Sequence, residues 1–406
     1  MEKIYLSILF LGCVILPISP AIANILFLTF SGIVIIHAFV VKEFPNKKDW
    51  LNLLVLPSFF FLWMLIGMLF SSYKKEAFRL IEISIPFLTF SLAYIFASKS
   101  LKQKAPVYIK KGFIVGVSSS ILYLGVMLLI RFYNADNESL LNIFSHTYTY
   151  YNFTFPINTH PTYYTVWILC ANYFVFQSKT LRTPIKVGLL LLFCFGIIFS
   201  MSRVGVLLYG IQIFVSFFFL SKTAKIIYAL CTLLVIFTGI YLYKYHLRNM
   251  YLLQRLSIEL AWDTNPENTE SEINNRVADD SRTARWLAIW ETIKKKPISG
   301  YGVGSERTIL DKTYSTNDLN ISLERKYNTH NLYLFYMLEQ GIIGLFLFLS
   351  YFFINLVLAI KRKDFFVFSF IVGIMIVFMF ENYLYRSMGY LTVALLLTFM
   401  RTTSKK

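Results

Sequence analysis

The sequence is short of charge, cysteine, glycine and proline. Only 15% of its 406 residues are Asp, Glu, Lys or Arg, against about 25% in an average soluble domain, so the chain cannot cover a water-exposed surface of its size. Four cysteines exclude a disulfide-stapled scaffold, and 18 glycines and 11 prolines exclude collagen-like and disordered classes. Apolar residues are plentiful, since 57% of the chain is hydrophobic and 18% aromatic. This balance predicts a protein embedded in a membrane.

Apolar runs near the length that crosses about 30 Å of hydrocarbon recur along the whole chain. They predict an all-α, polytopic integral membrane protein with about 12 transmembrane helices. The expected spans are 4–20, 21–41, 51–70, 80–97, 112–131, 161–177, 185–200, 203–220, 224–243, 331–355, 364–380 and 383–400. The start resembles a secretory signal that ends at Ala21-Ile22-Ala23. Because a second apolar run follows directly, we expect an uncleaved first helix.

Lysine and arginine gather in alternate connections between these spans. With the N-terminus inside, the cytoplasmic segments carry 20 basic residues, whereas the short outer connections carry 6. This bias predicts a multi-pass protein with both termini in the cytoplasm. The net charge of +17 is therefore mainly a topology signal, and it does not indicate a nucleic-acid partner.

The chain divides into three parts on this scheme. Residues 1–243 hold helices one to nine, 244–330 form one large periplasmic loop, and 331–406 hold helices ten to twelve. Within the loop, 263–280 is rich in Asn, Glu, Thr and Ser and is expected to lack regular structure.

A helix is expected next in the loop, from Arg282 to about Lys296, with Ser281 or Asp280 as its cap. Its predicted apolar face consists of Trp286, Ile289, Trp290 and Ile293. Pro297 ends the helix, and the turn Gly300-Tyr301-Gly302-Val303-Gly304 follows.

His330 is a candidate general base by its position, where the loop re-enters the membrane in Thr329-His330-Asn331-Leu332. An imidazole with a pKa near 6.5 can accept a proton from a sugar hydroxyl at working pH. A histidine that only forms structural hydrogen bonds is the alternative. His160, at the start of span six, is a secondary candidate, as is Asn331 beside His330. The aromatic segment 132–160 before that span suits either an interfacial belt or a wall for stacking sugars.

Three arginines on the outer side are candidates for holding a pyrophosphate, because guanidinium groups bind phosphate oxygens bidentately. Arg203 opens span eight, while Arg282 and Arg285 lie three residues apart on the predicted loop helix. The alternatives are snorkelling of Arg203 to the interface and surface pairing of the other two with Asp279 or Asp280. Further ionisable residues near the spans are expected to pair internally, namely Glu339, Arg79 with Glu82, and Glu381 with Arg386.

No metal or cofactor is expected. The chain contains no Asp-x-Asp, its cysteines fall within spans without metal-ligand spacing, and Glu270-Ser271-Glu272 lies in the polar stretch that is expected to be loop. Gly300 and Gly302 are secondary site candidates, but their turn is no dinucleotide fingerprint, because no strand precedes it.

The architecture and a series of motifs resemble the O-antigen ligase/polymerase superfamily of bacterial envelope glycosyltransferases. The resemblance covers about 200–350. It consists of Ser202-Arg203, Ser281-Arg282-Thr283-Ala284-Arg285-Trp286, Pro297-Ile298-Ser299-Gly300-Tyr301-Gly302, His330-Asn331-Leu332-Tyr333-Leu334 and Glu339-Gln340-Gly341-Ile342-Ile343-Gly344, in that order.

The resemblance implies a metal-independent, inverting transferase at the outer membrane face. Its donor would be a glycan on undecaprenyl pyrophosphate, and its acceptor a lipid A–core sugar or another glycan. His330 would match the family's proposed base, and Arg203 and Arg282 would match its pyrophosphate-binding arginines. Arg285 would be an additional basic neighbour.

Three other functions remain open from the sequence. The nearest is a polymerase of the same superfamily, which joins repeat units on lipid carriers, and the next is a protein oligosaccharyltransferase. A flippase or secondary transporter is also polytopic, but such proteins commonly carry internal repeats and buried charges near the midplane. Here the polar residues gather at the outer surface instead.

Overall fold

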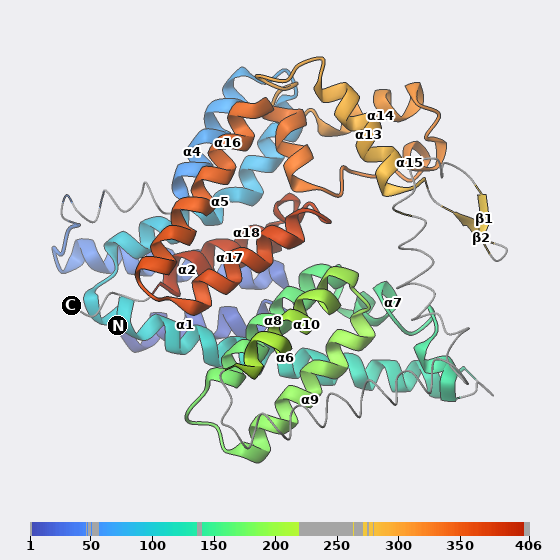
Figure 1. Cartoon of the computed structure of the whole chain (residues 1–406). Helices are drawn as coiled ribbons and strands as arrows, with labels where there is room; N and C mark the ends of the chain where they lie inside the picture. Colours follow the sequence, from blue (N-terminus) through green and yellow to red (C-terminus); the bar gives the residue numbers. More distant parts are fainter. Residues whose placement is uncertain are drawn as a thin grey trace. The chain divides into compact units, whose positions relative to one another are not determined.

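The computed structural model describes residues 2–45, 47, 50, 57–135, 140–218, 263, 271–273, 276–278 and 280–401. These residues are predominantly helical (Figure 1). They fall into two compact units, the first built from Met1–Gly116 and Asp263–Lys406 and the second from Val117–Trp262. The long helix α6 (Lys99–Tyr133) runs from the first unit into the second.

The first unit contains most of the apolar helices and all of the short helices of the polar segment, which we define as residues 280–331. Its other helices before that segment are α1 (Glu2–Ile15), α2 (Pro20–Val40), α4 (Ser58–Phe70) and α5 (Lys74–Phe96). The polar segment holds α13 (Arg282–Ile293), α14 (Glu306–Thr316) and α15 (Asn320–Glu324). After it come α16 (Leu332–Lys361), α17 (Phe365–Phe378), η5 (Tyr383–Tyr385) and α18 (Ser387–Phe399).

The second unit is also helical. It consists of the later part of α6 followed by η2 (Leu140–Phe144), α7 (Tyr151–Thr154), η3 (Phe155–Ile157), α8 (Pro161–Gln177), α9 (Thr183–Ser200) and α10 (Arg203–Phe217). Helix α8 packs against both α9 and α10. Gly205 of α10 allows a close approach, because a Cβ atom there would lie 2.2 Å from the side chain of Thr165 on α8.

In the part of the chain that the structure describes, five helices are long and apolar enough to cross a membrane: α2, α5, α6, α9 and α16. Together with the shorter apolar helices, they confirm the prediction of a multi-pass helical membrane protein. Every predicted span overlaps a helix except 224–243, which lies outside the described residues, as does most of 244–279. The count of twelve spans and the three-part division at 243 and 330 stay predictions.

Aromatic rings fill the interior of the first unit. Phe27 of α2 and Phe90 of α5 meet edge to face with centroids 5.3 Å apart, and Phe30 meets Phe399 of α18 at 5.6 Å. All four side chains are buried. Other faces of these helices carry exposed apolar residues such as Ile36, as expected where lipid is the solvent.

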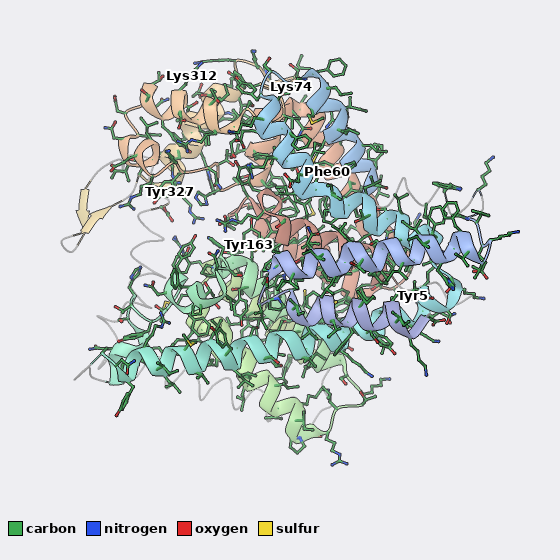
Figure 2. The ribbon with its side chains drawn as sticks, turned by 180° about the vertical axis from the view of Figure 1, so that it is seen from behind. Tyr5, Phe60, Lys74, Tyr163, Lys312 and Tyr327 are labelled. Atoms are coloured by element: carbon green, nitrogen blue, oxygen red, sulfur yellow. The ribbon has the colours of Figure 1, made fainter. Side chains whose placement is uncertain are left out.

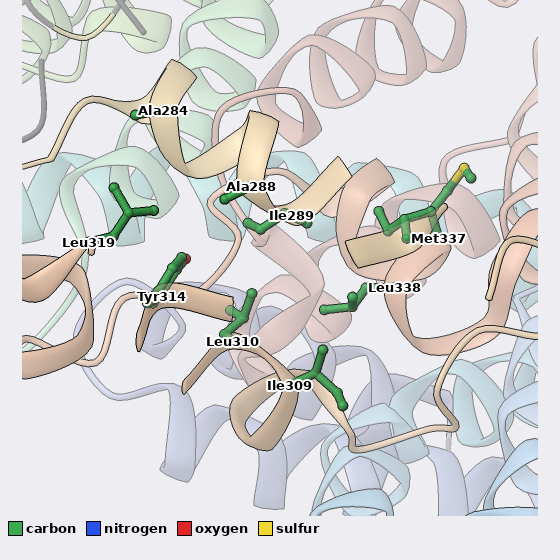
Figure 3. Close-up of a cluster of buried hydrophobic side chains, with 10 residues drawn as sticks. Ala284, Ala288, Ile289, Ile309, Leu310, Tyr314, Leu319, Met337 and Leu338 are labelled. Atoms are coloured by element: carbon green, nitrogen blue, oxygen red, sulfur yellow. The ribbon is translucent and has the colours of Figure 1, made fainter. Parts of the chain in front are cut away.

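The polar segment has its own small hydrophobic cluster (Figure 3). Ile289 and Ile293 of α13 pack with Leu310 and Tyr314 of α14, and Leu338 of α16 joins them. The cluster therefore fastens two helices of the segment to the first turns of α16. Tyr327 and Lys312 also belong to this segment (Figure 2).

The expected loop helix forms, but this region differs from the sequence prediction in three respects. Ser281 is its cap, since its Oγ accepts from Ala284 N at 3.1 Å, but the helix ends at Ile293 rather than Lys296. Trp290 is 42% exposed, because the buried stripe runs through Ala284, Ala288 and Ile289, which turns residue 290 outward. In the stretch expected to be loop, β1 (Ser271–Ile273) and β2 (Arg276–Ala278) pair as a short antiparallel hairpin.

Helix α16 is interrupted at Gly341, whose φ of 63° is not helical. The interruption is bridged by main-chain hydrogen bonds from the polar segment. Tyr301 N donates to Leu338 O at 2.9 Å, Gly302 N donates to Glu339 O at 2.7 Å, and Ile342 N donates to Pro297 O at 2.8 Å. Residues 297–302 are thereby joined to the backbone of an apolar helix.

We expect Gly341→Ala to weaken the fold. Its positive φ costs a residue with a side chain about 1–2 kcal/mol, and the added Cβ would lie 2.1 Å from Ile298 O, a backbone atom that cannot move aside. The thermal unfolding midpoint in detergent should fall by several degrees. Gly32→Ala is the matched control, because nothing lies within 4 Å of the Cβ it would add. Equal midpoints for the two variants would contradict the expectation.

Candidate functional site

His330 lies in the short connection between α15 and α16, in a backbone conformation that is unusual for its residue type. Its φ is 43°, in the left-handed region. Its N–H donates to Asn328 Oδ1 at 2.9 Å. The next residue, Asn331, caps α16 by accepting from Tyr333 N and Leu334 N at 3.0 and 3.1 Å. Such a conformation persists only where neighbouring contacts determine it.

The imidazole of His330 faces a carboxylate. Its Nδ1 lies 3.6 Å from Oε2 of Glu381, which stands between α17 and η5, and the two side chains are only 20% and 9% exposed. Burial lowers the pKa of His330 below its ordinary value, while Glu381 opposes this shift. The imidazole is therefore neutral, and able to accept a proton, over a wider pH range than an exposed histidine.

Arg282 and Arg285 begin α13 beside this pair. Arg282 donates through Nη1 to Phe380 O at 3.2 Å, next to Glu381, and its Nε lies 3.5 Å from Asp263 Oδ2. Its ion-pair partner among the described residues is thus Asp263 and not Asp280, whose carboxylate accepts instead from Ser322 N; Asp279 lies outside those residues.

Arg285 is the more deeply buried of the two arginines. It is only 6% exposed. Its Cζ stands 4.8 Å from the centre of the Tyr327 ring, and that ring meets His330 edge to face at 5.8 Å. Its Nε has no hydrogen-bond partner among the described residues. Burial lowers the pKa of Arg285, with the nearby charge of Arg282 acting in the same direction.

The two arginines act electrostatically on the histidine as well. Both lower the pKa of His330, adding to the effect of burial. One basic face therefore contains a neutral imidazole, its carboxylate partner and two guanidinium groups, of which one has an unmet hydrogen bond. Such a face suits an anionic ligand, which the guanidinium groups can bind, and a proton transfer to or from the imidazole.

The secondary candidates of the first unit have backbone roles. Asn331 is a helix cap, as described above. Gly300 has φ 66°, and a Cβ there would lie 2.5 Å from Gln340 N. Gly302 donates its N–H to Glu339 O. Both glycines therefore allow the polar segment to approach α16.

Arg203 and His160 belong to the second unit. His160 is buried and caps α8, since its Nδ1 accepts from Thr162 N at 3.1 Å, and its ring meets Tyr151 at 4.8 Å. Ser202 caps α10 ahead of Arg203, and its Oγ lies 3.1 Å from Thr162 Oγ1. The starts of α8 and α10 are thus joined, while a common site for Arg203 and His330 stays a prediction.

Several residues of the site are not predicted by the sequence analysis. Glu381 is expected to pair with Arg386, but the structure brings it to His330. Arg79 pairs with Glu76, at 2.8 Å, and not with the expected Glu82. The available signal was the polar pair Glu381-Asn382, which with Arg386 interrupts the apolar stretch from 365 to 400. In the described part of the chain, no three His, Cys, Asp or Glu side chains group as metal ligands, and metal independence stays a prediction.

The fold and this basic face define the class: a multi-pass helical membrane protein with a compact polar segment packed against a membrane helix. Residues 188–349 match the family model described as O-Antigen ligase. Over this part of the chain, the match confirms the predicted resemblance to the O-antigen ligase-like superfamily. That family implies a glycosyltransferase-like activity. The matched range includes Arg203, Arg282, Arg285 and His330. A comparison with curated proteins finds no match.

We expect the pKa of His330 to lie below about 6.5 and to fall further in Glu381→Gln. Glu381 favours the protonated imidazole, whereas burial and the charges of Arg282 and Arg285 disfavour it. Without the Glu381 carboxylate, only the effects that lower the pKa remain. The pH dependence of diethyl pyrocarbonate labelling, read at His330 by peptide mass spectrometry, reports the neutral imidazole. Glu291→Gln, which removes an exposed carboxylate paired with Lys294, is the control and should leave the midpoint unchanged. An unchanged or higher midpoint in Glu381→Gln would contradict the assigned contact.

Proposed function

We propose that the protein transfers a glycan from undecaprenyl pyrophosphate to a sugar hydroxyl of lipid A–core, at the periplasmic face of the bacterial inner membrane, with both termini in the cytoplasm. The observation that carries the proposal is the His330–Glu381 pair beside Arg282 and Arg285, at the head of α16. The family match at residues 188–349 supports the same class of reaction.

His330 is the proposed base. With Nδ1 turned toward Glu381, the tautomer protonated at Nδ1 leaves Nε2 as the basic nitrogen. The acceptor hydroxyl gives its proton to Nε2 while its oxygen forms a bond to the anomeric carbon of the donor. The bond from that carbon to the pyrophosphate oxygen breaks, and undecaprenyl pyrophosphate leaves with the electron pair. Attack opposite the leaving group inverts the anomeric centre.

The arginines are the proposed partners of the pyrophosphate. Departure of the lipid pyrophosphate increases negative charge on its oxygens, and fixed cations in a partly buried site stabilise that charge without a metal ion. Arg285 has an Nε hydrogen available and Arg282 lies beside it. Arg203 is the third arginine proposed to bind the pyrophosphate. The reaction on this scheme needs no cofactor.

The decisive experiment is transfer by the purified protein from a glycan on undecaprenyl pyrophosphate to lipid A–core, with and without EDTA. We expect transfer in both conditions. His330→Ala should lower the rate by about 10²–10⁴-fold, the usual contribution of an oriented base, while the protein remains in the membrane. His37→Ala, which changes a histidine on α2, is the control. Normal transfer by His330→Ala would refute the base assignment, and polymer that forms only on the lipid carrier would indicate a polymerase.

Replacing either site arginine by lysine should weaken use of the donor even though the charge is kept. Lysine has no planar fork, and at position 285 it also loses the stacking on Tyr327. Loss of one charge-assisted hydrogen bond, worth about 1.5–3 kcal/mol, corresponds to about a 10- to 100-fold fall in kcat/KM for the donor. Arg307→Lys is the control, because Arg307 pairs with Asp311 on α14. Equal donor kinetics in Arg285→Lys and Arg307→Lys would exclude the pyrophosphate role of Arg285.

A further inference from the structure

We propose that Glu306 is a positioning residue, whose carboxylate ties the backbone that carries His330 to the segment that carries Glu381. The inference rests on the proposed function, since it assigns to Glu306 the alignment of the proposed base, His330, with the carboxylate of Glu381. Glu306 is the first residue of α14, and the hydrogen bonds of its carboxylate among the described residues go to Thr329 and Asn382, the neighbours of that pair.

One oxygen of Glu306 makes both connections. Its Oε1 accepts from Thr329 N at 3.0 Å and from Asn382 Nδ2 at 3.0 Å. Thr329 directly precedes His330, and Asn382 directly follows Glu381. The hydroxyl of Thr329 also bonds the Asn382 amide, at 2.7–2.9 Å. Thr329 and Asn382, which are 53 residues apart in the sequence, are thus joined, and each is directly adjacent to one member of the pair.

The backbone at Glu306 is itself held by hydrogen bonds to a second carboxylate, that of Glu339. Its own N–H and that of Gly304 both donate to Glu339 Oε1, at 3.2 and 2.9 Å, and Glu339 stands on α16 just before the interruption at Gly341. A second buried carboxylate therefore fixes the turn from which Glu306 reaches the site. The result is a continuous polar connection from α16 to the His330–Glu381 pair.

The chemistry of Glu306 indicates a specific role rather than a general stabilising one. Only 2% of the residue is exposed, and within the described residues no Lys or Arg forms an ion pair with it. Burial raises its pKa, while the bonds from Thr329 and Asn382 and the charge of Arg79 oppose that shift. Burying a carboxylate without an ion-pair partner is unfavourable, and an apolar side chain would avoid this cost. A carboxylate here is useful as an acceptor of two hydrogen bonds.

The backbone of His330 is the second observation that requires such a tie. A positive φ is unfavourable for a residue with a side chain and persists where surrounding bonds determine it. Asn328 and the cap at Asn331 hold the two sides of His330 within its own segment. Glu306, together with the direct bond between Thr329 and Asn382, fixes this segment relative to Glu381.

The test compares Glu306→Ala with Glu306→Gln in the purified full chain, using the transfer assay. Glu306→Ala should lower kcat by about 10- to 100-fold, as expected when a catalytic group is displaced by a fraction of an ångström to an ångström, and leave the donor KM within about twofold. Glu306→Gln should recover most of kcat, because its amide oxygen still accepts both bonds. Glu324→Ala, which removes an exposed carboxylate on α15, is the control.

A double-mutant cycle separates positioning from loss of stability. If Glu306 acts by aligning Glu381 with His330, Glu306→Ala should cost much less in a Glu381→Gln background than in the wild type. If Glu306→Ala does not fold, Asn382→Ala, which removes the hydrogen bond between Glu306 and the Glu381 segment, takes its place with the same expectation. Full additivity, a kcat within twofold of the wild type, or a KM that rises as much as kcat falls would each overturn the inference.

The two proposals fail in different ways. A wild-type protein that does not transfer glycan refutes the proposed function, and the inference falls with it. A wild type that transfers, together with inactive His330→Ala and fully active Glu306→Ala, refutes only the inference. Recovery in Glu306→Gln together with a non-additive cycle supports both.

Discussion

The main-chain hydrogen bonds across the interruption of α16 are the constraint on which the rest of the site depends. A helix in an apolar setting must satisfy every backbone N–H and C=O, so it can be interrupted only where other groups replace its own hydrogen bonds. Residues 297–302 supply them, through Tyr301, Gly302 and Pro297. The same contact allows the carboxylate of Glu339 to accept hydrogen bonds from the N–H groups of Gly304 and Glu306. His330 directly precedes Asn331, the cap of α16. The bonds that hold the first turns of α16 therefore also hold the start of the helix beside the candidate base.

The electrostatics of the site follow from this packing. Burial keeps the imidazole neutral and, by displacing water, strengthens the interactions of the guanidinium groups around it. Arg282 is partly neutralised by Asp263, whereas Arg285 rests on the Tyr327 ring and keeps an unused donor. The arrangement places an unprotonated base and available positive charge close together. The same side chains exposed to water would not have this effect, because their charges would be screened by solvent and salt and the side chains would be mobile.

The sequence predicts the parts of the structure that are determined by local chemistry. Span lengths follow from hydropathy, the cap at Ser281 follows from residue type, and the turn at Gly300–Gly304 follows from glycine content. Contacts between distant segments are different, because nothing near Glu381 in the sequence indicates that it faces His330, and nothing near Glu306 indicates its bonds to residues 329 and 382. The exposed position of Trp290 also depends on packing, because Ala284 and Ala288 allow a closer approach than the larger rings. The family match adds the class of reaction but not these pairings.

The attachment of the polar segment to α16 has a consequence for how such a protein can change. Main-chain groups are the same in every residue, so most side chains between 297 and 302 can be exchanged without loss of the bonds that hold the segment. The strict requirements fall on a few positions, such as Gly341 and Gly300, where no Cβ fits. The exposed side chains around them, including Lys294, Lys295 and Ile298, are free to diverge. A fixed backbone frame beside His330 can thus be combined with a surface whose side chains vary.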